Sequence, residues 1–434
     1  MNQPVSSQFA LMRQRRYAPF YWVCFLGTFN DNLLKFAITL MLTYQLSVPW
    51  LPPEQVGPLL GALFTVPSLL LSAWFGMLAD KHPLDALTRL GKSAEVLMMG
   101  LAAWAVWARE PAALVACVLL SGVHVTWFST VKYAYMPRHL AGPELVGGNG
   151  LMEMGLFTAI LLGTLVGGAV ADQPWAVVAA VLGLAVLGRV AAGRVPHTPA
   201  AQPGLPVKFN PITQSWQQVR SAAQQGALPA ILGISWMWFF GATYMMLFPA
   251  LTREVYRAEA SVASALLAVV SIGIALGALC TEALAHRFGV RRVVALGAGL
   301  MAVCGGDIAW QAWSMGQHIA ALAPSQASTP APALIPLADA LGRPEFWRSV
   351  VGISLMSMGV GLFSVPLYAR MQAQASPDSR ARVVSANNVL NAVSMVLCAA
   401  LAGALQSAGM SLGGVLGVTV ALHLLAFAAL WRAL

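Results

Sequence analysis

Apolar runs of about twenty residues recur along the whole chain, separated by short segments in which charged residues, proline and glycine gather. A helix rises 1.5 Å per residue, so roughly 20 apolar residues cross a hydrocarbon core about 30 Å thick. Lipid offers no partner to free backbone groups, so such runs are expected to be helical. The pattern predicts twelve spans, at residues 18–46, 57–79, 90–108, 111–135, 149–171, 174–194, 228–250, 262–285, 292–314, 347–370, 384–406 and 411–432.

These spans fall into two groups of six. The segment 195–227 between the groups is rich in proline, and Gln and Ser replace Leu and Val there. We expect an N-terminal six-helix bundle at 1–194, a cytoplasmic linker at 195–227 and a C-terminal bundle at 228–434. A surface helix is expected inside the linker, near residues 214–225.

Composition supports this interpretation, because 58% of the residues are hydrophobic and only 9% are charged.

The distribution of basic residues predicts the orientation. Of the 25 lysines and arginines, eighteen fall in the segments that would be cytoplasmic if the N-terminus were inside, and five fall in segments on the external side. Basic residues are retained on the cytoplasmic side, so both termini are expected there. The same asymmetry explains the net charge of +9 without nucleic-acid binding.

Cofactors and metals are not expected. The five cysteines occur singly within spans, never in a ligand-like pair, which also argues against a disulfide. Gly91, Lys92 and Ser93 resemble the end of an ATP-binding loop, but Ala86 occupies the position of its first glycine. ATP is therefore not expected to drive this protein, and any transport by it would be passive or ion-coupled.

An internal repeat relates the two halves. Phe128, Ser129 and Tyr133 recur as Phe363, Ser364 and Tyr368 at a constant offset of 235, and residues 146–153 recur as 384–391. Spans four and five therefore correspond to spans ten and eleven. Such repeats place a transporter's substrate site near the interface of its halves.

Two glycine patterns predict close helix packing. Gly163 and Gly167 lie four residues apart in span five, and Gly273 and Gly277 lie four apart in span eight. Small residues at this spacing let helix backbones approach each other in a membrane. We expect packing contacts at both pairs.

A charged motif follows the second span. Gly76, Asp80 and Lys81, with Arg89 and Lys92 after a longer spacing, resemble the loop signature of the major facilitator superfamily. The glycine would allow close helix approach, and the acid could meet a helix N-terminus or a basic partner. We assign Asp80 and Lys81 to a gate, with solvated loop charges as the alternative. The second copy of this loop has His286 where the acid belongs.

A narrower resemblance spans both halves of the chain, and its most specific part is the stretch from Phe128 to Gly168. The segments that carry it are Phe29–Asn32, Lys132 and Tyr133, Asn149–Glu153, Ile160–Gly163, Gly167 and Gly168, and Val365–Leu367. They resemble the bacterial lysophospholipid transporters of the major facilitator superfamily. The family pattern has a basic residue near the position of Met245, and this sequence has none there.

The resemblance implies an all-α fold of twelve transmembrane helices in two bundles, in a bacterial inner membrane. It implies a flippase that moves lysophosphatidylethanolamine and related lysolipids from the outer to the inner leaflet for reacylation. An acyltransferase His-x-x-x-x-Asp motif is absent after all seven histidines, so acyl transfer would need a partner acyltransferase. Two alternatives stay open: an ion-coupled exporter of amphipathic drugs or other small solutes, and a membrane scaffold or subunit for an acyltransferase.

Charged residues inside spans mark candidate sites, because a central charge costs roughly 2.5 to 3.5 kcal/mol on insertion scales. Asp31 lies near the middle of span one and Lys35 lies one helical turn further. The two could pair with each other, or they could bind the ammonium and the phosphate of a lysolipid headgroup.

Lys132 and Glu153 lie near the ends of adjacent spans, where they could pair in one conformation and separate in another; alternatively, Lys132 could extend to lipid headgroups. Each asparagine could equally serve helix packing. The candidates for substrate binding are Asn30, Asp31, Asn32, Lys35, Tyr133, Tyr244, Asn387 and Asn391, and those for gating are Asp80, Lys81, Lys132, Asn149 and Glu153.

Overall fold

The computed structural model describes residues 8–46, 48, 50–51, 53–322 and 334–433. Within these residues a long helix lies at each of the twelve predicted spans, so the all-helical prediction is confirmed. These helices are α1 (Ala18–Leu40), α2 (Pro53–Lys81), α3 (Leu84–Ala108), α4 (Pro111–His139), α5 (Leu145–Val170), α6 (Pro174–Ala192), α8 (Leu228–Ala250), α9 (Ala260–Phe288), α10 (Val290–Leu322), α12 (Pro344–Gln374), α13 (Arg380–Ser407) and α14 (Leu412–Trp431).

Two shorter α-helices complete the set in the described residues, α7 (Pro211–Gln224) and α11 (Leu337–Ala340). Helix α7 is the surface helix expected inside the linker. A π-helix, Met41–Gln45, extends α1, and a second one, Leu251–Val255, extends α8.

Ten helices of the described chain are long and apolar enough to cross a membrane. The long helices α1 and α3 are not among them. Both carry several polar residues in their interior, including Asn30, Asp31 and Asn32 in α1 and Lys92 and Glu95 in α3. All five side chains are nevertheless buried, so these two helices turn their polar faces toward protein.

The chain divides into two compact units. Unit 1 comprises Met1–Ile231 and Ala369–Ala392, and unit 2 comprises Leu232–Tyr368 and Val393–Leu434. The first unit therefore includes residues 369–392, which contain the end of α12 and the start of α13. The division predicted at the linker, residues 195–227, stays a prediction.

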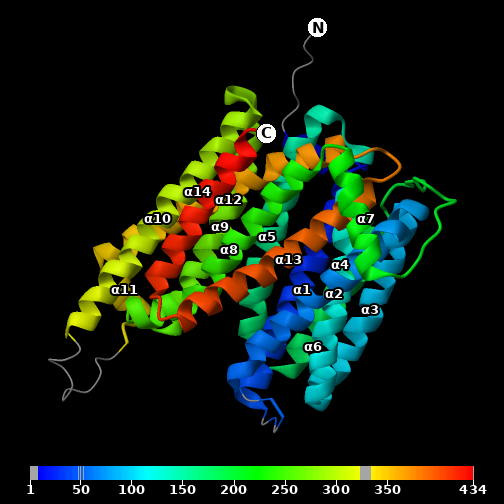
Figure 1. Ribbon diagram of the computed structural model, residues 1–434. Coiled ribbons are helices and arrows are strands. Elements are labelled where there is room, and N and C mark those ends of the chain that lie inside the picture. Colours follow the sequence, from blue (N-terminus) through cyan, green and yellow to red (C-terminus); the bar gives the residue numbers. More distant parts are fainter. Residues whose placement is uncertain (1–7, 47, 49, 52, 323–333, 434) are drawn as a thin grey trace. The chain divides into compact units, whose positions relative to one another are not determined.

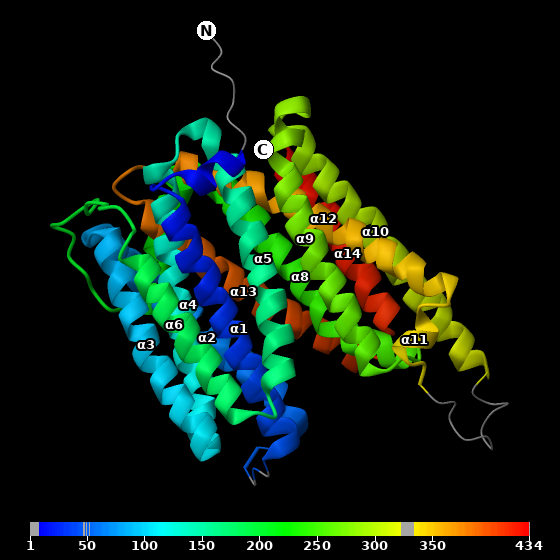
Figure 2. The same ribbon diagram turned by 180° about the vertical axis from the view of Figure 1, so that it is seen from behind.

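Within unit 1, α1 packs against α5 and α6, as Figures 1 and 2 show. Helix α2 packs on α4 and α7, and α3 packs on α4 and α6. The glycine pattern in α5 explains how closely α1 approaches. A Cβ added at Gly163 or Gly167 would lie 2.5 Å from the carbonyl oxygen of Phe29 or Leu33, respectively. The close approach predicted there is confirmed.

In unit 2, buried polar side chains form hydrogen bonds between helices. The ring of His423 on α14 accepts a hydrogen bond from the indole of Trp236 on α8, at 2.9 Å. Its other nitrogen lies 3.0 Å from the carbonyl oxygen of Ala298 on α10. The hydroxyl of Tyr244 donates to the carbonyl of Gly305, joining α8 to α10. In α9, Gly273 and Gly277 meet the backbone of α12, so the second glycine pattern is also confirmed.

The motif after the second span is helical where a loop was expected. Helix α2 ends at Lys81 and α3 begins at Leu84, so Asp80 and Lys81 lie in the last turn of α2. Arg89 and Lys92 lie inside α3. Lys92 is only 1% exposed, so counting it among the cytoplasmic loop residues was wrong.

The first part of the predicted linker lies against the ends of α2, α3 and α4. The amide of Leu84 donates to the carbonyl of Thr198, and the amide of Gln202 donates to the carbonyl of Asp80. Further along, Gln218 of α7 donates to the carbonyl of Ala73 on α2 at 2.8 Å. These bonds attach the segment to the helices of unit 1.

The glycine contacts give a stability prediction. Gly167→Ala should destabilise unit 1 by about 1–3 kcal/mol, because its Cβ would meet the α1 backbone and force the helices apart. The matched control is Gly183→Ala in α6, where an added Cβ meets no atom within 4 Å. Thermal unfolding in detergent should show a lower Tm for the first variant and an unchanged or higher Tm for the control. Equal midpoints would contradict the packing argument.

Candidate functional site

Four ionisable side chains meet in the interior of unit 1, from three different helices. The ammonium of Lys92 lies 2.5 Å from Oε2 of Glu95, and both residues belong to α3. Nε2 of His124 on α4 lies 3.3 Å from the same carboxylate oxygen, and its Nδ1 lies 3.6 Å from Oδ2 of Asp31 on α1. We call Asp31, Lys92, Glu95 and His124 the buried charge cluster.

Local helix geometry assembles this cluster. Lys92 and Glu95 are three residues apart, so they share one face of α3. Asn30 ties that face to α1 and α6, because its side-chain amide donates to Oε1 of Glu95 at 3.2 Å and to the carbonyl of Val181 at 3.1 Å. Every residue of the cluster is at most 9% exposed. Burial of charge is tolerated where an opposite charge lies nearby; Lys92 and Glu95 satisfy this condition for each other, and Asp31 has His124 beside it.

Two acceptors beside the cluster are unused. Oδ1 of Asp31 and Oδ1 of Asn30 are buried and make no hydrogen bond within the described part of the chain. A buried polar atom without a partner costs about 1–3 kcal/mol. Such atoms are expected where a ligand completes the bonding.

Lys35 does not pair with Asp31 in the described structure. Its ammonium lies 4.4 Å from the ring centroid of Phe64 on α2, a cation–π contact. Asn32 donates to the carbonyl of Thr28 in its own helix, at 2.8 Å. Of the four candidates in span one, the structure therefore brings only Asn30 and Asp31 to the buried charge cluster.

The predicted pair on α4 and α5 is formed. The ammonium of Lys132 lies 3.7 Å from Oε1 of Glu153, and both residues are 8% exposed. The hydroxyl of Tyr133 donates to the same oxygen at 2.6 Å, and the ammonium also lies 4.0 Å from the Tyr133 ring centroid. Lys132 is thus held by protein here, and does not extend outward.

Asp80 is fully buried and meets the start of α13. One carboxylate oxygen accepts from the amide of Ala381 at 3.1 Å, and the other accepts from the guanidinium of Arg382 at 3.0 Å. A carboxylate is stabilised at a helix N-terminus by the unpaired amides and the helix dipole. A Cβ at Gly76 would lie 2.6 Å from Oγ of Ser385, so the glycine is what lets α2 and α13 approach. Lys81, next to Asp80, is half-buried.

The asparagines divide into bonded and unbonded ones. Asn149 on α5 exchanges two hydrogen bonds with Gln372 on α12, at 2.8 and 3.0 Å. Asn388 on α13 donates to Oγ of Ser129 on α4 at 2.7 Å. Asn387 is fully buried, and both polar atoms of its side chain make no hydrogen bond within the described residues. Asn391 is half-buried on the same helix.

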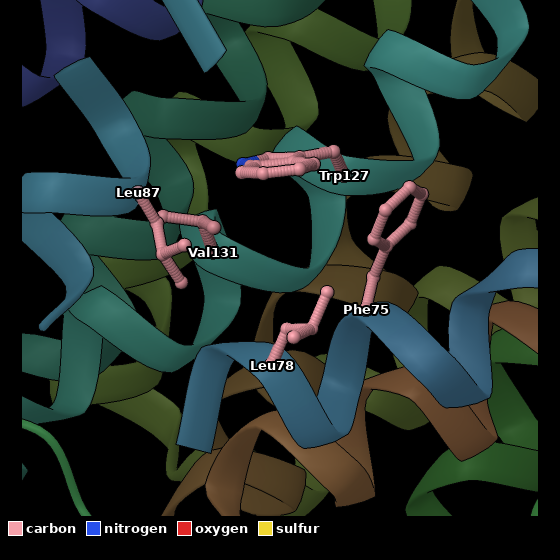
Figure 3. A pocket seen from close by; sticks show the side chains of 5 residues that line it. All are labelled: Phe75, Leu78, Leu87, Trp127 and Val131. Carbon is pink, nitrogen blue, oxygen red and sulfur yellow. The ribbon is translucent and has the colours of Figure 1, made fainter. Parts of the chain in front are cut away.

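Tyr244 belongs to unit 2, and its hydroxyl donates to the carbonyl of Gly305. In unit 1, five side chains from α2, α3 and α4 line a narrow crevice that has no room for a water molecule, and Figure 3 shows them. They are Phe75, Leu78, Leu87, Trp127 and Val131. None carries a charge, and among these five side chains only the indole N–H of Trp127 is polar.

Three residues of the cluster were not among the predicted site residues: Lys92, Glu95 and His124. Lys92 was assigned to a loop, and His124 was considered only as part of an acyltransferase motif. The available signal was the placement of Glu95 and His124 well inside apolar runs, where ionisable residues generally mark function. What sequence could not supply was their proximity to Asp31.

The chain is similar to known proteins in sequence and in fold. A family model described as Major Facilitator Superfamily matches residues 20–399. A protein of Klebsiella pneumoniae named lysophospholipid transporter LplT is 32% identical over 260 residues, covering 58% of this chain and 62% of the relative. The protein of that name from an Enterobacter species is 30% identical over 279 residues, covering 63% and 67%. The chain thus spans somewhat under two thirds of the Klebsiella relative's length.

Among solved structures, the human organic anion transporter MFSD10 has a TM-score of 0.70 with this chain. The match covers 95% of this chain and 99% of the other at 15% identity, so it speaks for the fold alone.

A double-mutant cycle tests the cluster's central pair. Lys92→Met and Glu95→Gln should each destabilise the protein by about 3–5 kcal/mol, because each leaves an opposite charge buried without its partner. The double variant removes both charges and should recover much of that loss. Tm and monodispersity in detergent measure the effect. A double variant as unstable as the sum of the singles would contradict a direct Lys92–Glu95 interaction.

Proposed function

This chain belongs to the major facilitator superfamily, and we propose that, like the relatives named lysophospholipid transporters, it transports lysophospholipids. It is a multi-pass membrane protein, and its named relatives are transporters. We propose that it moves lysophosphatidylethanolamine and related lysolipids from the outer to the inner leaflet of a bacterial inner membrane, with both termini in the cytoplasm. It would act as a carrier without catalysis, and a partner acyltransferase would reacylate the delivered lipid.

The observation that carries this proposal is the unpartnered oxygen of Asp31. This carboxylate lies at the middle of α1, 3% exposed, with Oδ1 free to accept a further hydrogen bond. An ethanolamine headgroup supplies an ammonium that fits a buried carboxylate acceptor. Lys35, one helical turn further, would meet the phosphate after leaving the face of Phe64.

Alternating access requires contacts that open and close. The bonds of residues 369–392 with the rest of unit 1 are suitable, since they join α2, α4 and α5 to α12 and α13. We propose that Asp80 and Arg382, together with Asn149 and Gln372, hold one conformation and separate in another. The Lys132–Glu153 pair would act beside them as an inner gate.

Transport of radiolabelled lysophosphatidylethanolamine into proteoliposomes tests the proposal. The wild-type protein should move the lipid above the level of empty liposomes, and Asp31→Asn should reduce movement to that level, because the ammonium loses its carboxylate. The matched control is Asp172→Asn, which removes an exposed carboxylate from the connection between α5 and α6. That variant should behave like the wild type.

The remaining outcomes separate the alternatives. Equal transport by wild type and Asp31→Asn would make Asp31 structural. No movement by folded protein under any imposed gradient would exclude lysolipid as cargo and favour the solute exporter. If the protein moves no ligand but an acyltransferase remains bound to it, the scaffold alternative would be supported.

The inner gate gives a separate prediction. Glu153→Gln should slow transport by roughly tenfold, because Lys132 and Tyr133 lose the carboxylate that both contact, and tenfold corresponds to about 1.4 kcal/mol. Exchanging the two charges, with Lys132→Glu and Glu153→Lys together, should restore part of the rate. Rates are measured in the same proteoliposomes. A charge-exchanged protein slower than Glu153→Gln would show that the pair has no gating role.

A further inference from the structure

One histidine lies between two carboxylates in the interior of unit 1. Its Nδ1 is 3.6 Å from Asp31, and its Nε2 is 3.3 Å from Glu95. Both nitrogens are buried and form no well-aligned hydrogen bond within the described residues. A neutral imidazole can donate from only one nitrogen, whereas an imidazolium donates from both. The position between two acceptors therefore suits the protonated ring.

The charge balance of the cluster favours the same state. Lys92 contributes one positive charge, and Asp31 and Glu95 contribute two negative charges. With a neutral imidazole the cluster carries one net negative charge, and one bound proton brings the net charge to zero. Net charge in a region of low dielectric is costly, so the interior favours the neutral total.

We propose that Asp31, Glu95 and His124 form a binding site for one transported or coupling proton, held on the imidazole of His124. The proton comes from water, and its binding makes or breaks no other covalent bond. Within the described residues no set of three or more His, Cys, Asp or Glu is arranged to hold a metal ion. A proton fits these groups, because an imidazole between two carboxylates can bind it and then donate to both.

Other charges lie further from His124 on the helices packed against α4. Lys132, eight residues later on α4 itself, is about 12 Å away along the helix and is paired with Glu153 of α5. On α1, Lys35 contacts Phe64. The acidic and basic residues of α2 occur near its ends, at Glu54, Asp80 and Lys81, and those of α3 besides the cluster are Asp85 and Arg89, which pair with each other. Near His124, the charged groups are those of the cluster.

The proton would also tie helices together. In the protonated state the ring attracts carboxylates on α1 and α3, so it joins both helices to α4. Loss of the proton removes that attraction and leaves Asp31 with Oδ1 and Oδ2 both lacking a positive partner. Occupancy of the site therefore biases how firmly α1 is held, which is how a bound ion couples to a conformational change.

The chain supplies its own control histidine. His423 in unit 2 is also buried, but its ring nitrogens contact the indole of Trp236 and the carbonyl of Ala298. The rings of Phe240 and Phe363, which are also neutral, lie near the imidazole. It accepts at Nδ1 and donates from Nε2, so the neutral ring satisfies both contacts. No carboxylate among these contacts favours a proton on it.

Hydrogen–deuterium exchange of α1 tests the site without any lipid. The protection factors of α1 amides are measured in detergent-solubilised wild type and corrected for intrinsic exchange. They should fall as the pH rises and the site releases its proton. The slope should approach about tenfold per pH unit, the value that linkage gives for one proton. His124→Gln should abolish this slope, and His423→Gln should retain it.

A second variant, Asp31→Asn, tests the same site in case His124→Gln does not fold. Asp31→Asn removes the excess negative charge, so it too should abolish the slope. The proposal would be overturned if α1 protection in the wild type did not depend on pH, or if a folded His124→Gln variant kept the slope. Equal loss of the slope in His423→Gln would also overturn it. Since no lipid is present, failure of lysolipid transport would leave this result standing, and the reverse also holds.

Discussion

An ion moved from water into a protein interior costs several kcal/mol unless partners surround it, and the centre of unit 1 is organised by that requirement. Lys92 and Glu95 neutralise each other on α3, and the second carboxylate, Asp31, depends on His124 from α4. Asn30 adds hydrogen bonds to Glu95 and to the backbone of α6. Four helices are thus held in register by groups that cannot be removed singly without leaving a charge unpaired. Glycines of α5 let this helix approach the backbone of α1 closely beside this region.

The same principle acts at the ends of the helices. Asp80 is buried because the first amides of α13 and the guanidinium of Arg382 satisfy it, and Gly76 removes the side chain that would block their approach. The amide pair of Asn149 and Gln372 does likewise between α5 and α12. These contacts are polar and few, in contrast to the apolar packing within the bundles. Polar contacts of this kind can exchange partners or water as a carrier changes conformation, whereas packed apolar faces cannot do so cheaply.

The proposed function and the proton site draw on different atoms of one carboxylate. Oδ2 of Asp31 lies toward His124, and Oδ1 has no partner in the described residues. A substrate ammonium and a bound proton would both offset the negative charge of Asp31, so occupancy of one would weaken the other by linkage. Such linkage would give the carrier a physical means of relating its cargo to an ion.

Sequence alone determined the helices, because runs of apolar residues about 20 long leave the backbone no other means of bonding in lipid. It also indicated the family and predicted the glycine contacts of α5 and α9. For Lys132 it left two alternatives, pairing with Glu153 or extension to lipid headgroups, and the structure has the pair. The start of α3 and the burial of Lys92 were missed, because a charged residue near an apolar run suggests a loop. Only tertiary structure decided that Asp31 faces His124 and not Lys35. That choice depends on how α1, α3 and α4 pack, and the spacing of residues along a single helix does not contain it.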